Sequence, residues 1–219
     1  MKVFIDFDDV IFNAKRFKED LIRVFLKNGI TRSEFENSYY TFQKRAQEWG
    51  QHYDPKKQIL VLRKKNKIDS KKLNKDLDVF MSNLKGYVFS DAYDFMKVFS
   101  KKDLFLITYG HVKFQMKKIE SSGVEKYFEK VLVTKNNKID EIMKMCRKCK
   151  FPSEEKIILI DDRPEQLEKA EKEKKSILTF RLCRPEGRYS DLICADKDYE
   201  AKNLKEVEKI LEKEGLVGA

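Results

Sequence analysis

The chain of 219 residues is 41% hydrophobic and 12% aromatic, a composition typical of folded globular proteins and not of disordered ones. Its formal net charge of +10 predicts attraction of phosphates and other anions. No apolar run reaches the roughly 20 residues that span a bilayer, and the first residues lack the basic and apolar regions of a signal peptide. We therefore expect a cytoplasmic protein without a membrane segment.

The first expected element is a buried strand at Val3–Ile5, and three carboxylates follow it: Asp6, Asp8 and Asp9. Acids this close together repel one another and are costly to bury. A divalent cation would remove that cost, and Mg²⁺ prefers carboxylate and phosphate oxygens. Chemistry in open α/β sheets lies at the carboxyl ends of the strands. The pattern therefore predicts a metal-assisted phosphate site within the first ten residues.

The next segment, from about Asn13 to Gly86, has helical periodicity and no convincing strand. The stretches with apolar or aromatic residues at helical spacing are 17–27, 32–49 and 69–84. An all-helical insertion is therefore expected after the first strand.

Beyond this insertion, apolar runs and amphipathic stretches alternate. The runs that predict buried parallel strands are Leu104–Ile107, Val131–Val133, Ile157–Ile160 and Ile177–Leu182. The stretches that predict helices are 91–99, 112–121, 138–149, 164–174 and 203–214. Strands that alternate with helices predict a doubly wound, mostly parallel α/β sheet.

Four segments of the chain, in fixed order, resemble the four motifs of the haloacid dehalogenase superfamily in its phosphatase form. They are Asp6-Phe7-Asp8-Asp9-Val10, the strand ending in Thr108-Tyr109-Gly110, Lys138 just before a helix, and the strand ending in Asp161-Asp162. The resemblance covers nearly the whole chain. It implies a core of residues 1–14 and 87–219 and a helical cap of residues 15–86. The position of this cap over the strand ends favours a lid, and a plain helical bundle without a substrate role is the alternative.

The resemblance also implies roles for the two acids of the first motif. Asp6 would be the nucleophile that forms an aspartyl-phosphate, and Asp8 would protonate the leaving oxygen and later deprotonate water. Asp6 and the backbone carbonyl of Asp8 would bind Mg²⁺. Dehalogenases lack the second acid, since a halide needs no proton, so Asp8 favours phosphoryl transfer. Asp9 occupies a variable position and is expected to be a bystander or a capping residue.

The second motif implies that Thr108 and the backbone amides of Tyr109 and Gly110 bind phosphoryl oxygens. Many members have Asn where Tyr109 stands. The third motif implies that Lys138 neutralises the phosphate and Asp6. Lys135, three residues earlier, is the alternative, and the position directly before the helix favours Lys138.

In the fourth motif, Asp162 is expected to be the direct metal ligand. Asp161 would support the lysine or a water of the outer metal shell. Other members have a further acid where this chain has Gln166.

The function predicted on this basis is a Mg²⁺-dependent phosphoric monoester hydrolase that acts on a small phosphorylated metabolite. A phosphomutase of the same fold is one alternative, and a nucleic-acid-binding protein or polynucleotide phosphatase is another. The dispersed Lys residues, interleaved with acids, favour a solvated surface over a nucleic-acid stripe, and the densest cluster, Arg63–Lys67, is short. The sequence does not determine the substrate or the oligomeric state.

Cys146 and Cys149 form one Cys-x-x-Cys pair without a second pair at zinc-ligand spacing, so ordinary reduced thiols are expected. The cap residues that are candidates for specificity are Arg45, Trp49, His52, Tyr53 and Arg63. For each of these, a surface or packing position is the other interpretation.

Overall fold

The computed structural model describes residues 1–49, 52–65, 68–172, 177–195 and 197–218. In this part of the chain, six strands form one sheet in the order β3-β2-β1-β4-β5-β6, and every pairing is parallel. The strands are β1 (Lys2–Ile5), β2 (Leu104–Tyr109), β3 (Lys130–Thr134), β4 (Ile157–Asp161), β5 (Ile177–Leu182) and β6 (Tyr199–Ala201). The doubly wound parallel sheet is thus confirmed, and the short edge strand β6 was not predicted.

Strands β1 and β4 lie at the centre of the sheet because their side chains are almost wholly apolar, as both faces of a parallel sheet require. Ile5 of β1 is in register with Leu106 of β2 on one side and with Ile160 of β4 on the other. This register places the first residues after β1 beside the carboxyl ends of β2 and β4.

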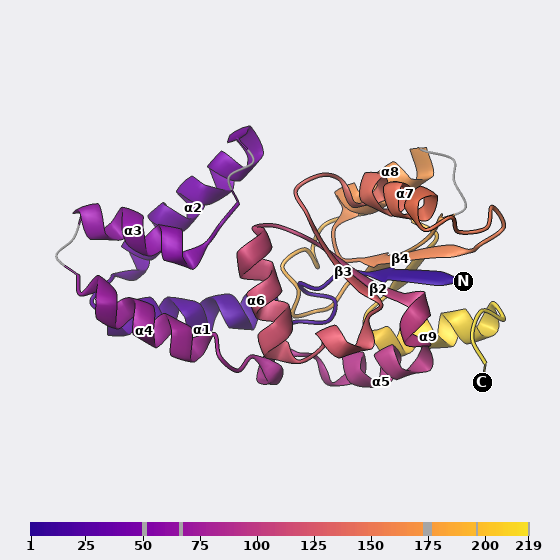
Figure 1. Ribbon diagram of the computed structural model, residues 1–219, viewed down its shortest axis with the longest axis horizontal. Helices are drawn as coiled ribbons and strands as arrows, with labels where there is room; N and C mark the ends of the chain where they lie inside the picture. The colour runs from indigo at the N-terminus through magenta and orange to yellow at the C-terminus, as the bar shows by residue number, and fades with distance from the viewer. Residues whose placement is uncertain (50–51, 66–67, 173–176, 196, 219) are drawn as a thin grey trace. The chain divides into compact units, whose positions relative to one another are not determined.

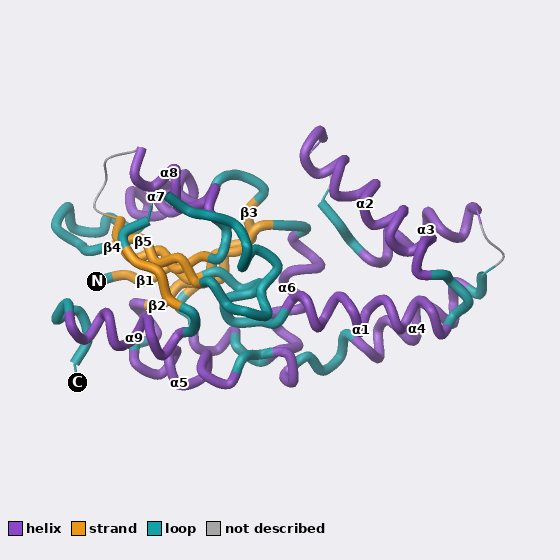
Figure 2. Tube along the Cα trace, turned by 180° about the vertical axis from the view of Figure 1, so that it is seen from behind, coloured by secondary structure: helices purple, strands orange, loops and turns teal. Residues whose placement is uncertain are grey.

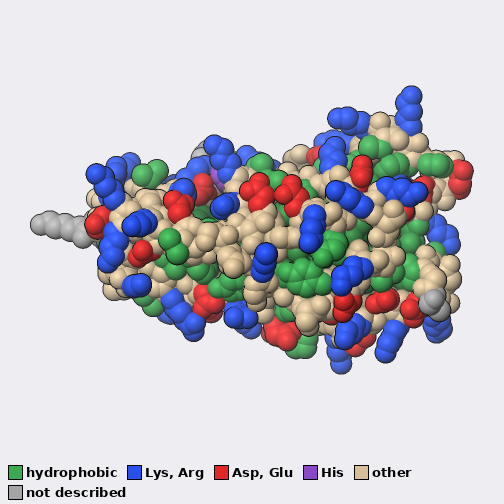
Figure 3. Space-filling view, turned by 60° about the horizontal axis from the view of Figure 1, so that its bottom comes forward, with side chains coloured by type: hydrophobic (Ala, Val, Ile, Leu, Met, Phe, Trp, Pro, Cys, Tyr) green, Lys and Arg blue, Asp and Glu red, His purple; other side chains and the backbone are tan. Residues whose placement is uncertain are grey.

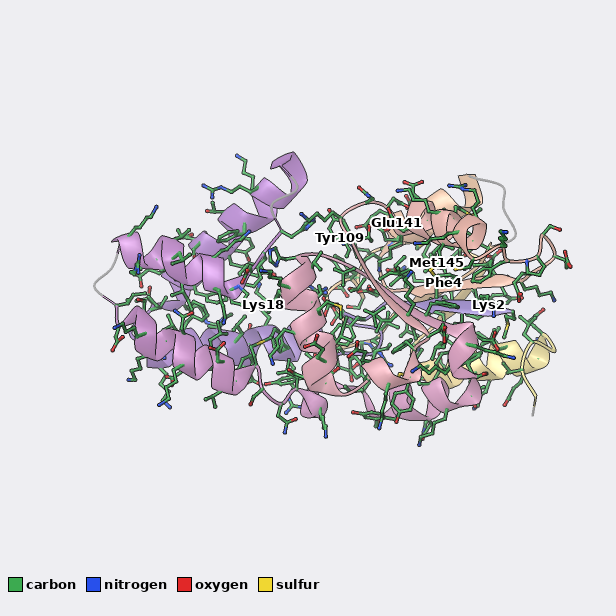
Figure 4. The ribbon with its side chains drawn as sticks, viewed as in Figure 1. Lys2, Phe4, Lys18, Tyr109, Glu141 and Met145 are labelled. Atoms are coloured by element: carbon green, nitrogen blue, oxygen red, sulfur yellow. The ribbon has the colours of Figure 1, made fainter. Side chains whose placement is uncertain are left out.

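Helices cover both faces of the sheet (Figures 1 and 2). One face carries α5 (Ser90–Val98) and α9 (Leu204–Lys213), and the other carries α7 (Lys138–Lys148) and α8 (Pro164–Lys172). The core under α7 and α8 includes Phe4, Ile107, Ile142, Met145 and Leu167, and Figure 4 labels Phe4 and Met145. No helix in the described ranges is both long and apolar enough to cross a membrane.

The chain separates into two compact units. Unit 1 consists of residues 1–15, 88–109 and 124–219, and it contains the whole sheet. Unit 2 consists of residues 16–87 and 110–123. The helical cap predicted from the sequence, residues 15–86, leaves out residues 110–123. Its boundaries stay a prediction.

The regular elements in the described part of unit 2 are all helical. They are α1 (Ala14–Lys27), which begins in unit 1, α2 (Arg32–Trp49), α3 (Pro55–Lys65), α4 (Ser70–Phe80), the 3₁₀ turn Lys85–Tyr87 and α6 (Val112–Ser122). Helix α6 belongs here because Phe114 packs against Phe17 and Tyr53, and because the Leu84 amide donates to the Ser121 carbonyl at 2.9 Å.

Unit 2 is held together by aromatic packing and by a buried amide. The Gln58 side chain is fully buried and donates to the Phe35 carbonyl at 2.9 Å and to Ser38 Oγ at 2.8 Å. Tyr53 donates its hydroxyl to Gln58 Oε1 at 2.6 Å, and His52 is buried. Tyr53 and His52 therefore have packing positions in unit 2.

The other candidate specificity residues of the cap have no comparable packing position. Arg45 and Arg63 are exposed. The Trp49 side chain lies outside the described residues.

Candidate active site

The loop after β1 carries the first acids into the interior of unit 1. The Asp6 amide donates to the Ile160 carbonyl at 2.9 Å, which continues the ladder between β1 and β4 by one residue. The amides of Ile11 and Phe12 both donate to the Phe7 carbonyl and close a tight turn. As a result Asp6 is buried at the end of the strand, while Asp8, on the turn, is half-buried.

Three of the predicted carboxylates meet at this point. Asp6, Asp161 and Asp162 are buried, and each offers a carboxylate oxygen within 4.8 Å of the others. Asp161 ends β4 and Asp162 follows it, so the register of β1 against β4 brings the two motifs together.

The Lys138 cation lies against this cluster. Lys138 is fully buried, and its Nζ is 2.8 Å from Asp6 Oδ1 and 2.6 Å from Asp161 Oδ2. Lys135 is exposed. Of the two lysines that the sequence left open, Lys138 is therefore the one beside Asp6.

The start of helix α7 positions this lysine. The Asn137 side chain caps the helix by accepting from the Ile139 amide at 2.8 Å, and the Lys138 amide donates to Gln166 Oε1 at 3.1 Å. Gln166 thus satisfies a backbone amide of α7. Its amide oxygen does this without adding another charge to the cluster.

Asp161 and Asp162 differ in their partners. Asp161 accepts from Lys138 Nζ with one oxygen and from the Arg163 amide at 3.0 Å with the other. Both oxygens of Asp162 are buried and have no hydrogen-bond partner among the described residues. A buried carboxylate without a partner is strongly destabilised unless a cation or a proton neutralises it.

The pKa values of Asp161 and Asp162 also reflect their different partners. Burial, together with the charges of Asp6 and Asp161, raises the pKa of Asp162 well above its ordinary value. Burial also raises the pKa of Asp161, although Lys138 opposes this shift. Burial alone would lower the pKa of Lys138, but Asp161 and Asp6 raise it above its ordinary value, so the lysine stays charged.

This donor set fits Mg²⁺. The three groups are carboxylates, which this ion prefers, and the unpartnered oxygens of Asp162 lie next to Asp6. Asp161 already uses both of its oxygens within the protein. The assignment of Asp162 as a direct ligand and of Asp161 as a supporting residue stays a prediction.

The second motif lies at the end of the neighbouring strand. Thr108 is buried near the end of β2, two residues beyond Leu106, which is in register with Ile5. Tyr109, labelled in Figure 4, is half-buried, and the Arg163 guanidinium lies over its ring at 5.3 Å. Gly110 has a φ of +150°, a conformation that favours glycine, and it belongs to unit 2.

An ion pair that the sequence did not predict lies beside the first motif. Asp9 is fully buried with a φ of +59°, and it accepts from the Ala14 amide at 3.1 Å, at the start of α1. Its other oxygen accepts from Arg188 Nε. Asp9 therefore has the capping role that was expected, together with an ionic partner 179 residues away in the sequence.

Arg188 lies in the segment between β5 and β6 and also faces the other acids. Burial alone would lower the pKa of Arg188, but the charges of Asp9 and Asp8 raise it above its ordinary value. Nothing in the sequence distinguished Arg188 from the many other basic residues, because its partners come from the opposite end of the chain.

Two further arginines anchor this segment. Arg184 donates to the Val10 carbonyl and to both oxygens of Asp91, at 2.8 and 3.0 Å, and lies over the Phe89 ring. Arg181 donates to the Tyr189 carbonyl at 3.0 Å. The backbone that carries Arg188 is thereby held against the loop after β1.

No protein-family model matches the sequence, and no curated protein matches it either. Solved structures do match, over 96% of this chain.

One is a haloacid dehalogenase-like hydrolase from Burkholderia xenovorans, with a TM-score of 0.74, 14% identity and 96% of that chain covered. Another is the HAD-hydrolase YfnB from Bacillus subtilis, solved with magnesium bound, with a TM-score of 0.62, 19% identity and 97% of that chain covered. The L-2-haloacid dehalogenase from Xanthobacter autotrophicus has a TM-score of 0.64, 12% identity and 98% of that chain covered. The chain therefore has the fold of the haloacid dehalogenases and their relatives, as the four motifs predicted.

Proposed function

We propose that the protein is a Mg²⁺-dependent phosphatase that hydrolyses a small phosphorylated metabolite through an aspartyl-phosphate on Asp6. The observation that carries this proposal is the buried cluster of Asp6, Lys138, Asp161 and Asp162, in which both oxygens of Asp162 lack a hydrogen-bond partner. Such a cluster is costly in a folded core unless a cation and an anionic substrate use it.

The proposed reaction has two steps. Asp6 attacks the phosphorus atom, the bond to the leaving oxygen breaks, and Asp8 gives that oxygen a proton. Asp8 then takes a proton from water, which attacks the aspartyl-phosphate and releases inorganic phosphate and the free Asp6 carboxylate. Lys138 neutralises charge on Asp6 and on the phosphoryl oxygens, and the Thr108 hydroxyl donates to one of those oxygens.

Asp6, Asp162 and the backbone carbonyl of Asp8 would hold the metal. When bound, Mg²⁺ supplies positive charge that stabilises the phosphoryl oxygens. Lys138 keeps Asp161 ionised and oriented, so Asp161 supports the lysine and not the ion.

Dehalogenation is the competing reaction, because some of the similar structures are L-2-haloacid dehalogenases. Asp8 favours phosphate chemistry, since an alkoxide leaving group needs a proton and a halide does not. The test measures phosphate release from a panel of phosphorylated metabolites and an aryl phosphate, and chloride release from 2-chloropropionate. We expect phosphate release only, and we expect Asp8→Asn to slow it. Chloride release without phosphate release would refute the proposal.

A metal titration tests the ligand assignment within the acidic pair. Asp162→Ala should weaken Mg²⁺ binding, measured by calorimetry, more than Asp161→Ala does. Activity should disappear with chelator and return with Mg²⁺. The reverse order of the two variants would show that Asp161 is the ligand.

A further inference from the structure

The formal charge of the chain is distributed unequally between the two units. Unit 1 contains 27 Lys and Arg residues and 27 Asp and Glu residues, so its formal net charge is zero. Unit 2 contains 20 Lys and Arg residues and 10 Asp and Glu residues. The whole net charge of +10 therefore belongs to the smaller, helical unit.

Within unit 2, cations surround a surface hollow between α3 and α4. The hollow has a volume of about 780 Å³, and its lining residues are Arg63, Ser70, Lys71, Asn74, Lys75, Asp78, Val79 and Ser82. Figure 3 shows one face of the molecule, with Lys and Arg side chains projecting from its surface. The lining of the hollow thus contains three basic side chains and one acidic side chain.

The three cations of the hollow are not neutralised by the protein itself. Arg63, Lys71 and Lys75 are exposed, and the described residues offer them no ion-pair partner. Asp78, the acid of the hollow, is instead paired with Lys56 at 2.9 Å. The charge of Arg63, Lys71 and Lys75 is therefore available to a ligand.

The spacing of these cations suits a ligand with repeated negative charges. Lys71 and Lys75 are four residues apart in α4, so they lie on one face of the helix, about 6 Å apart along its axis. Arg63 comes from the facing helix α3. A single phosphate carries at most two negative charges, fewer than these three cations, whereas a chain of phosphates carries one negative charge for each phosphate.

We propose that the hollow between α3 and α4 binds the phosphate backbone of a nucleic acid. The residues that would position it are Arg63, Lys71 and Lys75, in an interaction that does not depend on base sequence. Val79 is the one apolar residue in the described lining. A nucleic acid therefore suits this surface better than an anionic membrane, which selects helices with a broad apolar face. The interaction needs no turnover, so it goes beyond the proposed function.

The test is fluorescence anisotropy of a labelled single-stranded DNA of about 20 nucleotides with the full-length protein in chelator. Binding is measured from about 50 to 300 mM salt for the natural chain and for Arg63→Gln/Lys71→Gln/Lys75→Gln. Since each phosphate contact contributes about 0.7 to the log–log salt slope, the variant should lower that slope by about 2. It should also weaken binding at the lowest salt by about tenfold or more.

The matched control is Lys101→Gln/Lys205→Gln/Lys209→Gln, which removes three exposed cations from unit 1. It lowers the net charge equally and should leave the salt slope nearly unchanged. Equal losses in both variants would show that binding reflects overall charge alone, and would overturn the proposal. Tight binding to anionic vesicles without binding to DNA would overturn it as well. Aryl phosphate turnover, measured separately with Mg²⁺, should be the same in both variants.

Discussion

The two units of this protein place their charged residues in opposite ways. Unit 1 is formally neutral but buries charged side chains in pairs, such as Lys138 with Asp161 and Arg184 with Asp91. Unit 2 carries the entire net charge, yet it buries neutral polar groups such as Gln58 and exposes most of its cations. Lys118 is a buried cation of unit 2, and it donates to Gln115 at 2.9 Å.

This difference corresponds to two uses of charge. Buried charges are expensive, and they act strongly over short distances because little water screens them. Exposed charges cost little and act over longer distances, but salt screens them. Unit 1 has the arrangement expected for chemistry, and unit 2 has the one expected for association.

The largest expected effect concerns the nucleophile in unit 1. Asp6→Asn keeps the shape of the side chain but removes the attacking carboxylate, so phosphate release should fall by about 10³-fold or more. The exposed Asp94→Asn in the same unit is the control and should retain full activity. Near-normal turnover of the Asp6 variant would exclude the covalent mechanism.

The second prediction concerns the buried cation. Lys138→Met should lower the free energy of unfolding by about 3–5 kcal/mol, because Asp6 and Asp161 lose their shared partner inside the protein. Lys135→Met, at an exposed position, should change it by less than about 0.5 kcal/mol. Urea unfolding of the metal-free proteins measures both values. Equal effects would contradict the different environments of the two lysines.

The third prediction concerns the Asp9–Arg188 ion pair. Arg188 retains 33% side-chain exposure, so Arg188→Gln should cost only about 1–3 kcal/mol of stability. A double-mutant cycle with Asp9→Asn should give a coupling energy of about 0.5–3 kcal/mol. Turnover should fall about tenfold or more, since the same turn carries Asp8. The exposed Asp94–Lys97 pair is the reference, with an expected coupling below about 1 kcal/mol.

The fourth prediction concerns pH. The pKa of Asp162 is raised in the folded, metal-free protein, so folding stability is lost as the pH rises from the ordinary Asp range towards the raised pKa. This cost is absent below the ordinary Asp range, and Mg²⁺ also removes it by binding the carboxylate. Stabilisation by Mg²⁺ should therefore increase with pH above the ordinary Asp range, by up to about 1.4 kcal/mol per pH unit for each proton displaced. Thermal unfolding with and without Mg²⁺ measures this, and Asp162→Asn should reduce the dependence.

The smallest effect should be that of salt on catalysis. An increase from about 50 to 300 mM salt should change kcat for a small aryl phosphate by less than about threefold, because the charged groups around Asp6 are buried. The same change should strongly weaken nucleic-acid binding to unit 2. If the same increase in salt lowered kcat and nucleic-acid binding equally, the buried charges of unit 1 and the exposed charges of unit 2 would not have separate functions.

The sequence determined the sheet and the identity of the residues that meet in it. Apolar runs predicted five of the six described strands, because a buried parallel strand is apolar on both faces. Asp6, Lys138, Asp161 and Asp162 could be named in advance, because each follows a strand or precedes a helix in a pattern that a known family shares. The strand β6 was missed because it is only three residues long and partly exposed.

Only the tertiary structure decided which distant residues become partners. It paired Asp9 with Arg188 and added α6 to the helices of unit 2. Each of these depends on strand order and on the paths of connecting segments, which local periodicity does not encode. The same is true of the charge distribution: the basic residues are dispersed along the sequence, and their concentration on unit 2 emerges only when the chain is divided by its folded contacts.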